Sequence, residues 1–242
     1  MRALEDDRVT TERLRGTVWA RFELASVLYR TLLVFGRWLG ELGVTANQLT
    51  VLSLLLAVAS GVAIALGAPW MALSAIVVSG LFDALDGIVA RATRSSSRGG
   101  ALLDSVVDRV ADAAPLTGIV VLVTHTERPT LALVPALAMV GGFTVSYIRA
   151  RAEALGAVLP PLYARRAERV VVVAVSIALS GWLGLAGWGL PALLAGVGLV
   201  AVASLFGAVH ALIVARRLLA PTIRALPVAL PRDEVPPSKR AA

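Results

Sequence analysis

Residues 46–67, which read ANQLTVLSLLLAVASGVAIALG, decide the fold class of this chain. The stretch has no charged residue, and a helix needs about 20 apolar residues to cross the hydrocarbon core of a bilayer. Five more stretches of this kind follow, at residues 70–92, 100–124, 130–152, 166–184 and 188–214. Their apolar residues are continuous rather than alternating, which favours helices over transmembrane β-strands. We therefore predict an all-α polytopic membrane bundle of six transmembrane helices.

The composition of the whole chain supports the same class. Of its 242 residues, 57% are hydrophobic and 16% are charged, whereas soluble domains carry about 25% charged residues. The 23 Lys and Arg residues outnumber the 16 Asp and Glu residues, giving a net charge of +7. Because the arginines flank apolar spans, we expect them to face anionic lipid rather than nucleic acid. A soluble globular enzyme, a disordered protein and a nucleic-acid reader are excluded.

The arginines also predict an orientation. The connections near residues 68–70 and 183–188 carry no charge, and the one near 125–129 carries only Glu127 and Arg128. The opposite ends of the runs hold Arg91, Arg94, Arg98, Arg149, Arg151, Arg165, Arg166, Arg169, Arg216 and Arg217. By the positive-inside rule these ends lie in the cytoplasm, and six spans then place both termini there, in a cell-membrane protein.

Three regions follow along the chain. Residues 1–43 form an N-terminal cytoplasmic segment, residues 44–217 the six-helix domain, and residues 218–242 a proline-rich tail that we expect to be disordered. Within the first region, apolar positions from Val18 to Leu39 fall near one helical face. This pattern predicts an amphipathic helix lying along the inner leaflet, with a helix packed on the end of the bundle as the alternative.

Four carboxylates in the second and third apolar runs point to chemistry. Asp83 and Asp86 are spaced i, i+3, and Asp104 and Asp108 are spaced i, i+4, so a hairpin of two helices brings all four to one depth. Each costs about 2.5–3.5 kcal/mol at the centre of a bilayer, so such residues mark ion or substrate sites. Polar helix-packing contacts or a proton relay are the alternatives. For Asp112, one turn further on, we expect a supporting hydrogen bond.

The cations that neutralise these carboxylates can be predicted from their chemistry. Four converging carboxylates repel one another unless cations are present, and oxygen ligands suit Mg²⁺ or Mn²⁺ better than zinc. Two such ions would cancel four negative charges, and paired divalent ions are common in displacement reactions at phosphorus.

The spacing of these residues resembles the signature of the CDP-alcohol phosphotransferases, D-x2-D-G-x2-A-R-x8-G-x3-D-x3-D. The matching positions are Asp83, Asp86, Gly87, Ala90, Arg91, Gly100, Asp104 and Asp108. The resemblance implies an N-terminal interfacial helix, six spans and a cytosol-facing cavity. It implies an enzyme that moves the phosphatidyl group of CDP-diacylglycerol to an alcohol and releases CMP. It also implies a homodimer.

The resemblance assigns roles to individual residues. Asp83, Asp86, Asp104 and Asp108 would ligate two metal ions, with Asp83 and Asp104 bridging both, and Asp108 would also accept the proton of the alcohol. The CDP-lipid would contact Gly87, Ala90, Arg91, Ser97 and Gly100. Asn47 and Thr50 match a further nucleotide-binding pattern of the family, T-P-N-x-x-T, although Ala46 replaces its proline. Helix capping by Thr45 or Asn47 is the alternative for this stretch.

Serine and arginine residues near the fourth and fifth runs bear on the acceptor. Ser146, Arg149 and Arg169 would form a phosphate clamp at the cytoplasmic mouth, with topology signalling and headgroup contact as the alternative. The surrounding sequence resembles actinobacterial phosphatidylinositol-phosphate synthases, which implies inositol phosphate as the acceptor. Those relatives have Lys in place of Arg149 and an arginine near His210, where this chain has none. His210 is the candidate substitute, with a structural role as the alternative.

The predicted function is therefore phosphatidyl transfer in phospholipid biosynthesis, with a polyol phosphate as the acceptor. Glycerol 3-phosphate is the second acceptor to consider. A cation-coupled transporter is the alternative of another class, but the sequence has no pair of interrupted helices of the kind transporters use.

Overall fold

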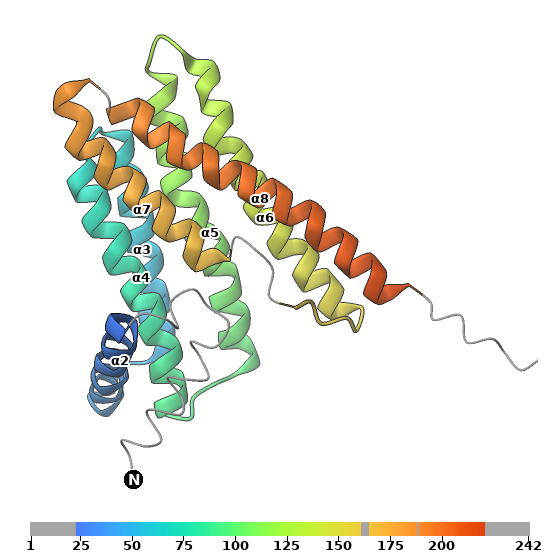
Figure 1. Ribbon diagram of the computed structural model, residues 1–242. Helices are drawn as coiled ribbons and strands as arrows, with labels where there is room; N and C mark the ends of the chain where they lie inside the picture. Colours follow the sequence, from blue (N-terminus) through green and yellow to red (C-terminus); the bar gives the residue numbers. More distant parts are fainter. Residues whose placement is uncertain (1–22, 161–164, 188, 221–242) are drawn as a thin grey trace, which may run out of the picture.

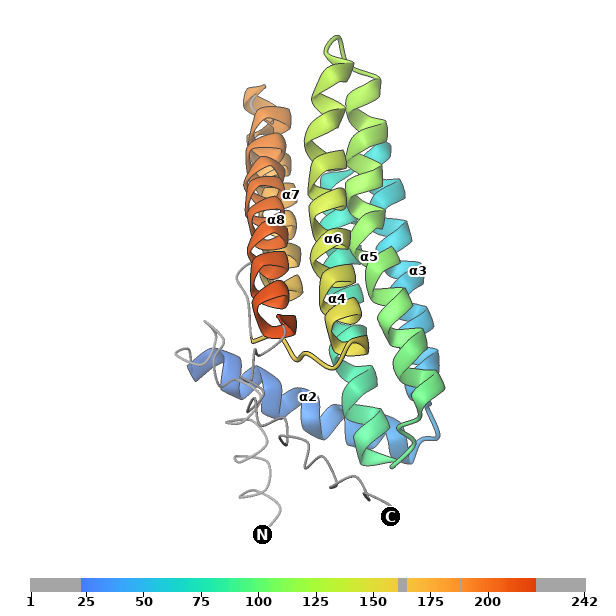
Figure 2. The ribbon, with the colours of Figure 1, turned by 90° about the vertical axis from the view of Figure 1, so that its right-hand side faces the viewer.

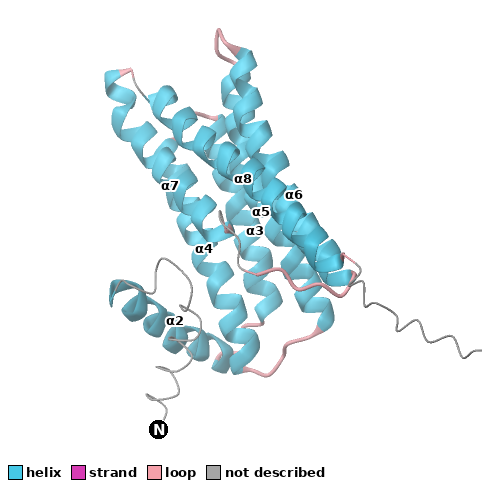
Figure 3. Ribbon diagram, turned by 45° about the vertical axis from the view of Figure 1, so that its right-hand side comes forward, coloured by secondary structure: helices cyan, strands magenta, loops and turns pink. Residues whose placement is uncertain are grey.

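The computed structural model describes residues 23–160, 165–187 and 189–220. All regular structure in this part of the chain is helical (Figure 3). The α-helices are α2 (Glu23–Glu41), α3 (Ala46–Ala65), α4 (Pro69–Ala92), α5 (Arg98–Thr124), α6 (Leu133–Ala154), α7 (Arg166–Leu183) and α8 (Gly189–Leu219), with 3₁₀ turns η2 (Pro129–Ala132) and η3 (Gly184–Ala186). A helix lies at each of the six predicted runs, and the boundaries differ by a few residues.

Helices α3 to α8 run alternately up and down between the two ends of the bundle, and α8 is strongly inclined to α3 and α4 (Figures 1 and 2). The α4–α5 connection, the start of α7 and the end of α8 lie at one end of the bundle, where α2 crosses nearly at right angles. We call this the α2 end, and the opposite end, with the α3–α4, α5–α6 and α7–α8 connections, the far end. The three connections at the far end are the charge-poor ones. The distribution of arginines predicted that they lie opposite the arginine-rich ends of the helices.

Four helical stretches are long and apolar enough to cross a membrane. They are Ala46–Ala65, Pro69–Ala92, Pro129–Ala154 and Gly189–Leu219. Helices α5 and α7 lie beside them in the bundle, but charged residues occur along α5 as far as Asp112 and in the first turn of α7. Six crossings therefore remain a prediction.

Small residues let the helices approach closely. A Cβ added to Gly118 on α5 would overlap the carbonyl oxygen of Gly61 on α3, so no side chain separates these two backbones. On the other side of the bundle, a Cβ added to Gly141 on α6 would lie 2.8 Å from the Cβ of Ser204 on α8. Close backbone contact at small residues is a typical way for membrane helices to associate.

Helix α2 packs on the α2 end through one of its faces. Leu33 is buried, and a Cβ added to Gly36 would lie 2.6 Å from the Cγ2 of Ile88 on α4. Its other face exposes Val34 and Trp38, at 65% and 51%. The contact with α4 fits the alternative of a helix packed on the end of the bundle, and the placement of α2 along the inner leaflet stays a prediction.

Two predictions fall on other parts of the chain. The predicted N-terminal helix began at Val18, and residues 18–22 lie outside the described residues. The predicted disordered tail, residues 218–242, also lies almost entirely outside the described residues. Its first two residues belong to α8, which ends at Leu219, and residues 221–242 are not described.

Candidate active site

Three carboxylates from two helices meet in the half of the bundle nearer the α2 end. Asp83 on α4 and Asp104 and Asp108 on α5 each offer an oxygen, and these oxygens lie within 4.8 Å of one another. Asp104 and Asp108 share a face of α5 because they are one turn apart. The antiparallel α4–α5 hairpin supplies Asp83 at the same depth, as the spacing predicted.

Asp86 does not belong to this group. Three residues after Asp83, it points about 60° away around the helix, and it faces α3. Its side chain is buried, with 6% exposed, and its Oδ2 accepts a hydrogen bond of 2.7 Å from the hydroxyl of Thr50. The structure thus gathers three of the four predicted ligands directly and ties the fourth to α3.

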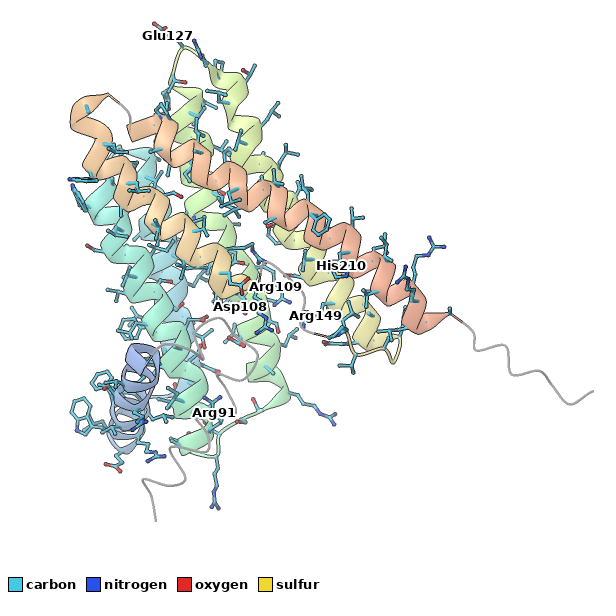
Figure 4. The ribbon with its side chains drawn as sticks, in the orientation of Figure 1. Arg91, Asp108, Arg109, Glu127, Arg149 and His210 are labelled. Atoms are coloured by element: carbon cyan, nitrogen blue, oxygen red, sulfur yellow. The ribbon has the colours of Figure 1, made fainter. Side chains whose placement is uncertain are left out.

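Several residues of the predicted nucleotide site lie around the α4–α5 connection. The Ser97 hydroxyl caps α5 by accepting a hydrogen bond of 3.0 Å from the backbone N–H of Gly100. A Cβ added to Gly100 would lie 3.5 Å from the Oδ1 of Asn47. On α4, a Cβ added to Gly87 would lie 3.1 Å from the Nη1 of Arg91, which Figure 4 shows near the α2 end. The absent side chains at Gly87 and Gly100 leave room beside polar groups.

The N-terminus of α3 shows that the capping alternative for this stretch holds for Thr45, and the nucleotide contact of Asn47 stays a prediction. Thr45 is the capping residue, because its hydroxyl accepts from the backbone N–H of Gln48 at 3.4 Å. Its own N–H donates to the Gln48 side chain at 2.9 Å, which completes a capping box. Asn47 is exposed and takes no part in this cap.

Arg166, the first residue of α7, is the main feature that the sequence reasoning missed. Its Nη1 lies 2.9 Å from both oxygens of Asp83 and 2.8 Å from the Oδ1 of Asp108. Its Nε donates to the Oδ1 of Asp112 at 2.9 Å, and the Nη2 of Arg169 donates to the other oxygen of Asp112 at 2.9 Å. Asp112 is therefore a support for two arginines, in line with the supporting role predicted for it.

Two cavities meet at these charged groups. One, of about 440 Å³, extends into the bundle among mostly apolar side chains and reaches Asp83, Asp112, Ser146, Arg166 and Arg169. The second, of about 450 Å³, is lined by Asp108, Arg109, Asp112, Val145, Ser146, Arg149, Leu159, Arg165, Arg166 and Arg169. We call the second one the basic pocket. All three predicted acceptor residues line it, and Figure 4 shows Asp108, Arg109 and Arg149 in this region of the bundle.

The basic pocket has more positive than negative groups. Five arginines and two aspartates line it, and Asp108 and Asp112 already contact Arg166 and Arg169. Such a surplus suits an anion with the charge of a phosphate, about −2. Arg109 and Arg165 were not among the predicted acceptor residues. Arg165 precedes Arg169 by four residues in the sequence, so its charge was a usable signal.

His210, the candidate substitute for a missing arginine, does not line either of these cavities. Its ring lies 6.4 Å from that of Phe206 on the same helix, measured between centroids. This contact fits the structural alternative.

The carboxylate group fits a hard divalent cation. The donor set consists of carboxylate oxygens, which Mg²⁺ and Mn²⁺ prefer. The Oδ1 of Asp108 is buried and accepts no hydrogen bond, although the Nη1 of Arg166 lies 2.8 Å away in an ion pair. An oxygen in this situation is suited to a metal ion.

The fold and the site define a helical protein in which membrane-capable helices carry a carboxylate group beside a basic pocket. A family model described as CDP-alcohol phosphatidyltransferase matches residues 43–208. The chain therefore belongs to the CDP-alcohol phosphatidyltransferase family, and it is a membrane enzyme of the CDP-alcohol phosphotransferase type. This result removes the transporter alternative.

Individual relatives agree with this assignment. The chain is 36% identical over 144 residues to the archaetidylinositol phosphate synthase of Pyrococcus horikoshii, covering 58% of this chain and 73% of the relative. It is 36% identical over 146 residues to the phosphatidylinositol phosphate synthase of Corynebacterium glutamicum, covering 58% and 66%.

Solved structures show the same likeness. The phosphatidylinositol phosphate synthase of Mycobacterium tuberculosis with CDP-DAG bound matches with a TM-score of 0.70 and 30% identity, covering 77% of this chain and 94% of that one. The same enzyme in complex with manganese and citrate matches with a TM-score of 0.69 and 30% identity, covering 76% and 88%.

Proposed function

We propose that this enzyme transfers the phosphatidyl group of CDP-diacylglycerol to inositol phosphate and releases CMP. The observation that carries the proposal is the position of the basic pocket, which shares Asp108 with the carboxylate group. The acceptor's phosphate and its reacting hydroxyl can then be held on either side of that carboxylate. The named relatives differ in the lipid part of their names, archaetidyl or phosphatidyl, but share inositol phosphate.

In this proposal two Mg²⁺ or Mn²⁺ ions would be held by Asp83, Asp86, Asp104 and Asp108. When bound, divalent ions would draw negative charge from the pyrophosphate during transfer. Asp86 would serve from its place beside α3, where the Thr50 hydroxyl fixes one of its oxygens. Thr50, predicted as a nucleotide contact, therefore acts through Asp86 in this proposal.

The nucleotide lies between the α4–α5 connection and the start of α3 in this proposal. Gly87, Ala90, Arg91, Ser97 and Gly100 would contact the CDP group together with Asn47. Two geometric details support this placement: the space beside Gly100 reaches Asn47, and Asn47 is not used as the helix cap. The guanidinium of Arg91 supplies a charge for a phosphate near Gly87.

Ser146, Arg149 and Arg169 hold the phosphate of the acceptor in this proposal. Asp108 takes the proton of the acceptor hydroxyl. The hydroxyl oxygen of the acceptor attacks the phosphorus that bears the diacylglycerol. The bond from that phosphorus to CMP breaks, and CMP leaves with the electron pair. A positioned base of this kind contributes about 10²–10⁴-fold to the rate.

Radiolabelled CDP-diacylglycerol in membranes that contain the enzyme tests the proposal. We expect labelled lipid product and CMP with inositol phosphate, and no product with free inositol. If product forms with glycerol 3-phosphate and not with inositol phosphate, the acceptor is glycerol 3-phosphate. A lack of transfer to every phosphorylated acceptor, with folded protein in the membrane, would contradict the proposal.

We also propose six membrane crossings, with both termini in the cytoplasm of the cell membrane, and a homodimer. The support for the crossings and their orientation is the concentration of arginines at the α2 end and the charge-poor connections at the far end. The homodimer is proposed from the family resemblance. The domain would comprise residues 44–217. Because the chain has no cysteine, a cysteine introduced by Ser96→Cys would be the sole site that a thiol reagent can label. In intact cells it should be protected from an impermeant thiol reagent, and labelling would contradict this orientation.

A further inference from the structure

One guanidinium connects the carboxylate group to the basic pocket. Arg166 lies at 2.8–2.9 Å from oxygens of Asp83, Asp108 and Asp112. These three residues belong to α4 and α5, whereas Arg166 begins α7, so the contacts join three helices. Arg166 lines both cavities.

The oxygens that Arg166 contacts include those a metal ion needs. Asp83 and Asp108 are two of the three residues of the carboxylate group, and Nη1 of Arg166 touches both oxygens of Asp83 and one of Asp108. A divalent ion on these oxygens would lie against the guanidinium as a like charge, with little water between them. Like charges at such distances repel strongly in a partly buried site. The metal and the Nη1 end of Arg166 therefore compete for Asp83 and Asp108.

The rest of the side chain shows where this end can go. Nε of Arg166 is held by Asp112, which lies outside the carboxylate group. A pivot of the whole planar guanidinium about the hydrogen bond from Nε to Asp112 would therefore move Nη1 off Asp83 and keep the side chain at the pocket. There it would join Ser146, Arg149 and Arg169, the proposed phosphate contacts.

We propose that Arg166 is a positioning residue that couples the two ligands of the enzyme: it holds Asp83 and Asp108 until a divalent ion takes their oxygens, and it then turns to the anion in the basic pocket. The proposal rests on the proposed function for the nature of that anion, the acceptor's phosphate. Because coupling between two binding sites is reciprocal, an anion in the pocket strengthens metal binding by the factor by which metal strengthens anion binding.

Binding of Mn²⁺ to the purified full-length protein in detergent tests the coupling without catalysis. Free Mn²⁺ is followed by its electron paramagnetic resonance signal, with sulfate as the anion probe and no CDP-lipid present. In the wild type we expect sulfate to lower the Kd for Mn²⁺ by about 5-fold or more, which is the lower range of allosteric couplings. In Arg166→Gln we expect a Kd for Mn²⁺ about 10-fold lower without sulfate, and no effect of sulfate.

Arg151→Gln is the matched control, since it removes one positive charge that is exposed near the end of α6 and does not line the basic pocket. Arg151 has no ion pair with a carboxylate among the described residues. We expect this variant to keep the sulfate effect and to change the Kd for Mn²⁺ less than Arg166→Gln does. Equal changes in both variants, or a sulfate effect that survives in Arg166→Gln, would overturn the proposal.

Arg166→Lys covers the case in which the glutamine variant does not fold. Lysine keeps the charge, but its single ammonium group cannot stay on Asp112 while it turns to the pocket. We expect the sulfate effect to fall, and an unchanged effect would overturn the proposal. These measurements involve no transfer reaction, so they can fail while inositol phosphate is a substrate, and they can succeed while it is not.

Discussion

The helices α3, α4 and α5 differ from α6, α7 and α8 in how they contribute to the site. The first three carry all of the carboxylates that surround it, and α3 and α5 touch backbone to backbone at Gly61 and Gly118. Ser146 and most of the arginines that line the cavities come from α6 and from the start of α7, whereas Arg109 comes from α5. The contrast teaches that the anionic part of the site and most of its cationic part are held by separate packing units, with the cavities between them.

The first prediction tests the anionic unit. Asp104→Asn removes one member of the carboxylate group, so the proposed metal site loses a charged ligand. A bound metal stabilises a transition state by several kcal/mol, and transfer should therefore fall by about 10³-fold or more. Initial rates of CMP release measure the loss.

Asp112→Asn is the comparison for this variant, since Asp112 contacts arginines and lies outside the carboxylate group. It should keep metal-dependent turnover and raise the KM for the acceptor. Wild-type activity that survives EDTA would show that the carboxylates have another role.

The second prediction tests the contact of α3 with α5. A valine at Gly118 would press on the Gly61 backbone, which cannot move away as a side chain can. Overpacking costs 1–3 kcal/mol, and here we expect about 3 kcal/mol of lost folding stability. Thermal unfolding in detergent measures it.

Gly80→Ala serves as the control, because a Cβ at Gly80 meets no atom within 4 Å. It should leave the Tm unchanged or raise it slightly. A Gly118→Val protein with the wild-type Tm would mean that the two helices are not in close contact.

The third prediction tests the cationic unit. Arg149→Ala should raise the KM for a phosphorylated acceptor by about 10–100-fold, since a hydrogen bond to a charged group is worth about 1.5–3 kcal/mol. The metal ligands are untouched, so the kcat should change little. Steady-state kinetics with varied acceptor concentration separate the two constants.

Arg151→Ala provides the matched comparison on the same helix. Arg151 is exposed and does not line the basic pocket. It should leave the KM unchanged, and equal effects of the two substitutions would indicate a general charge effect instead of a phosphate contact.

The fourth and smallest effect concerns the link between α3 and Asp86. Thr50→Val keeps the shape of the side chain but removes the hydroxyl that donates to Asp86. We expect a loss of about 1–2 kcal/mol in folding stability, because a buried acceptor loses its partner. Thermal unfolding measures it, and Thr50→Ser, which keeps the hydroxyl, should recover most of the loss. Equal Tm values for the valine variant and the wild type would contradict this role.

The sequence allowed good predictions wherever a local period determined the result. The continuous apolar runs predicted the six helices, and the i, i+4 spacing of Asp104 and Asp108 predicted their common face. Thr45, one of the two predicted capping candidates, caps the start of α3. Each of these features depends on residues within about two turns of one another.

Predictions were poorer where distant segments meet. Arg166 contacts Asp83 across 83 positions of the chain, and no local pattern indicates which of several neighbouring arginines takes that place. Asp86 illustrates the same limit. Its spacing from Asp83 predicted that both carboxylates belong to one site. The Asp86 side chain instead contacts Thr50 on α3, and the place of α3 beside α4 cannot be read from that spacing.

The contacts of Arg166 also have a consequence for biosynthesis. Its partners Asp83 and Asp112 precede it by 83 and 54 residues. Ribosomes add about 5–20 residues per second, so the acidic helices α4 and α5 are made several seconds before their arginine exists. During that interval protons or divalent ions must neutralise the aspartates, or water must solvate them. Assembly of the site therefore ends with the arrival of α7, and a chain stopped before α7 would hold its acidic residues in the bilayer without this counterion.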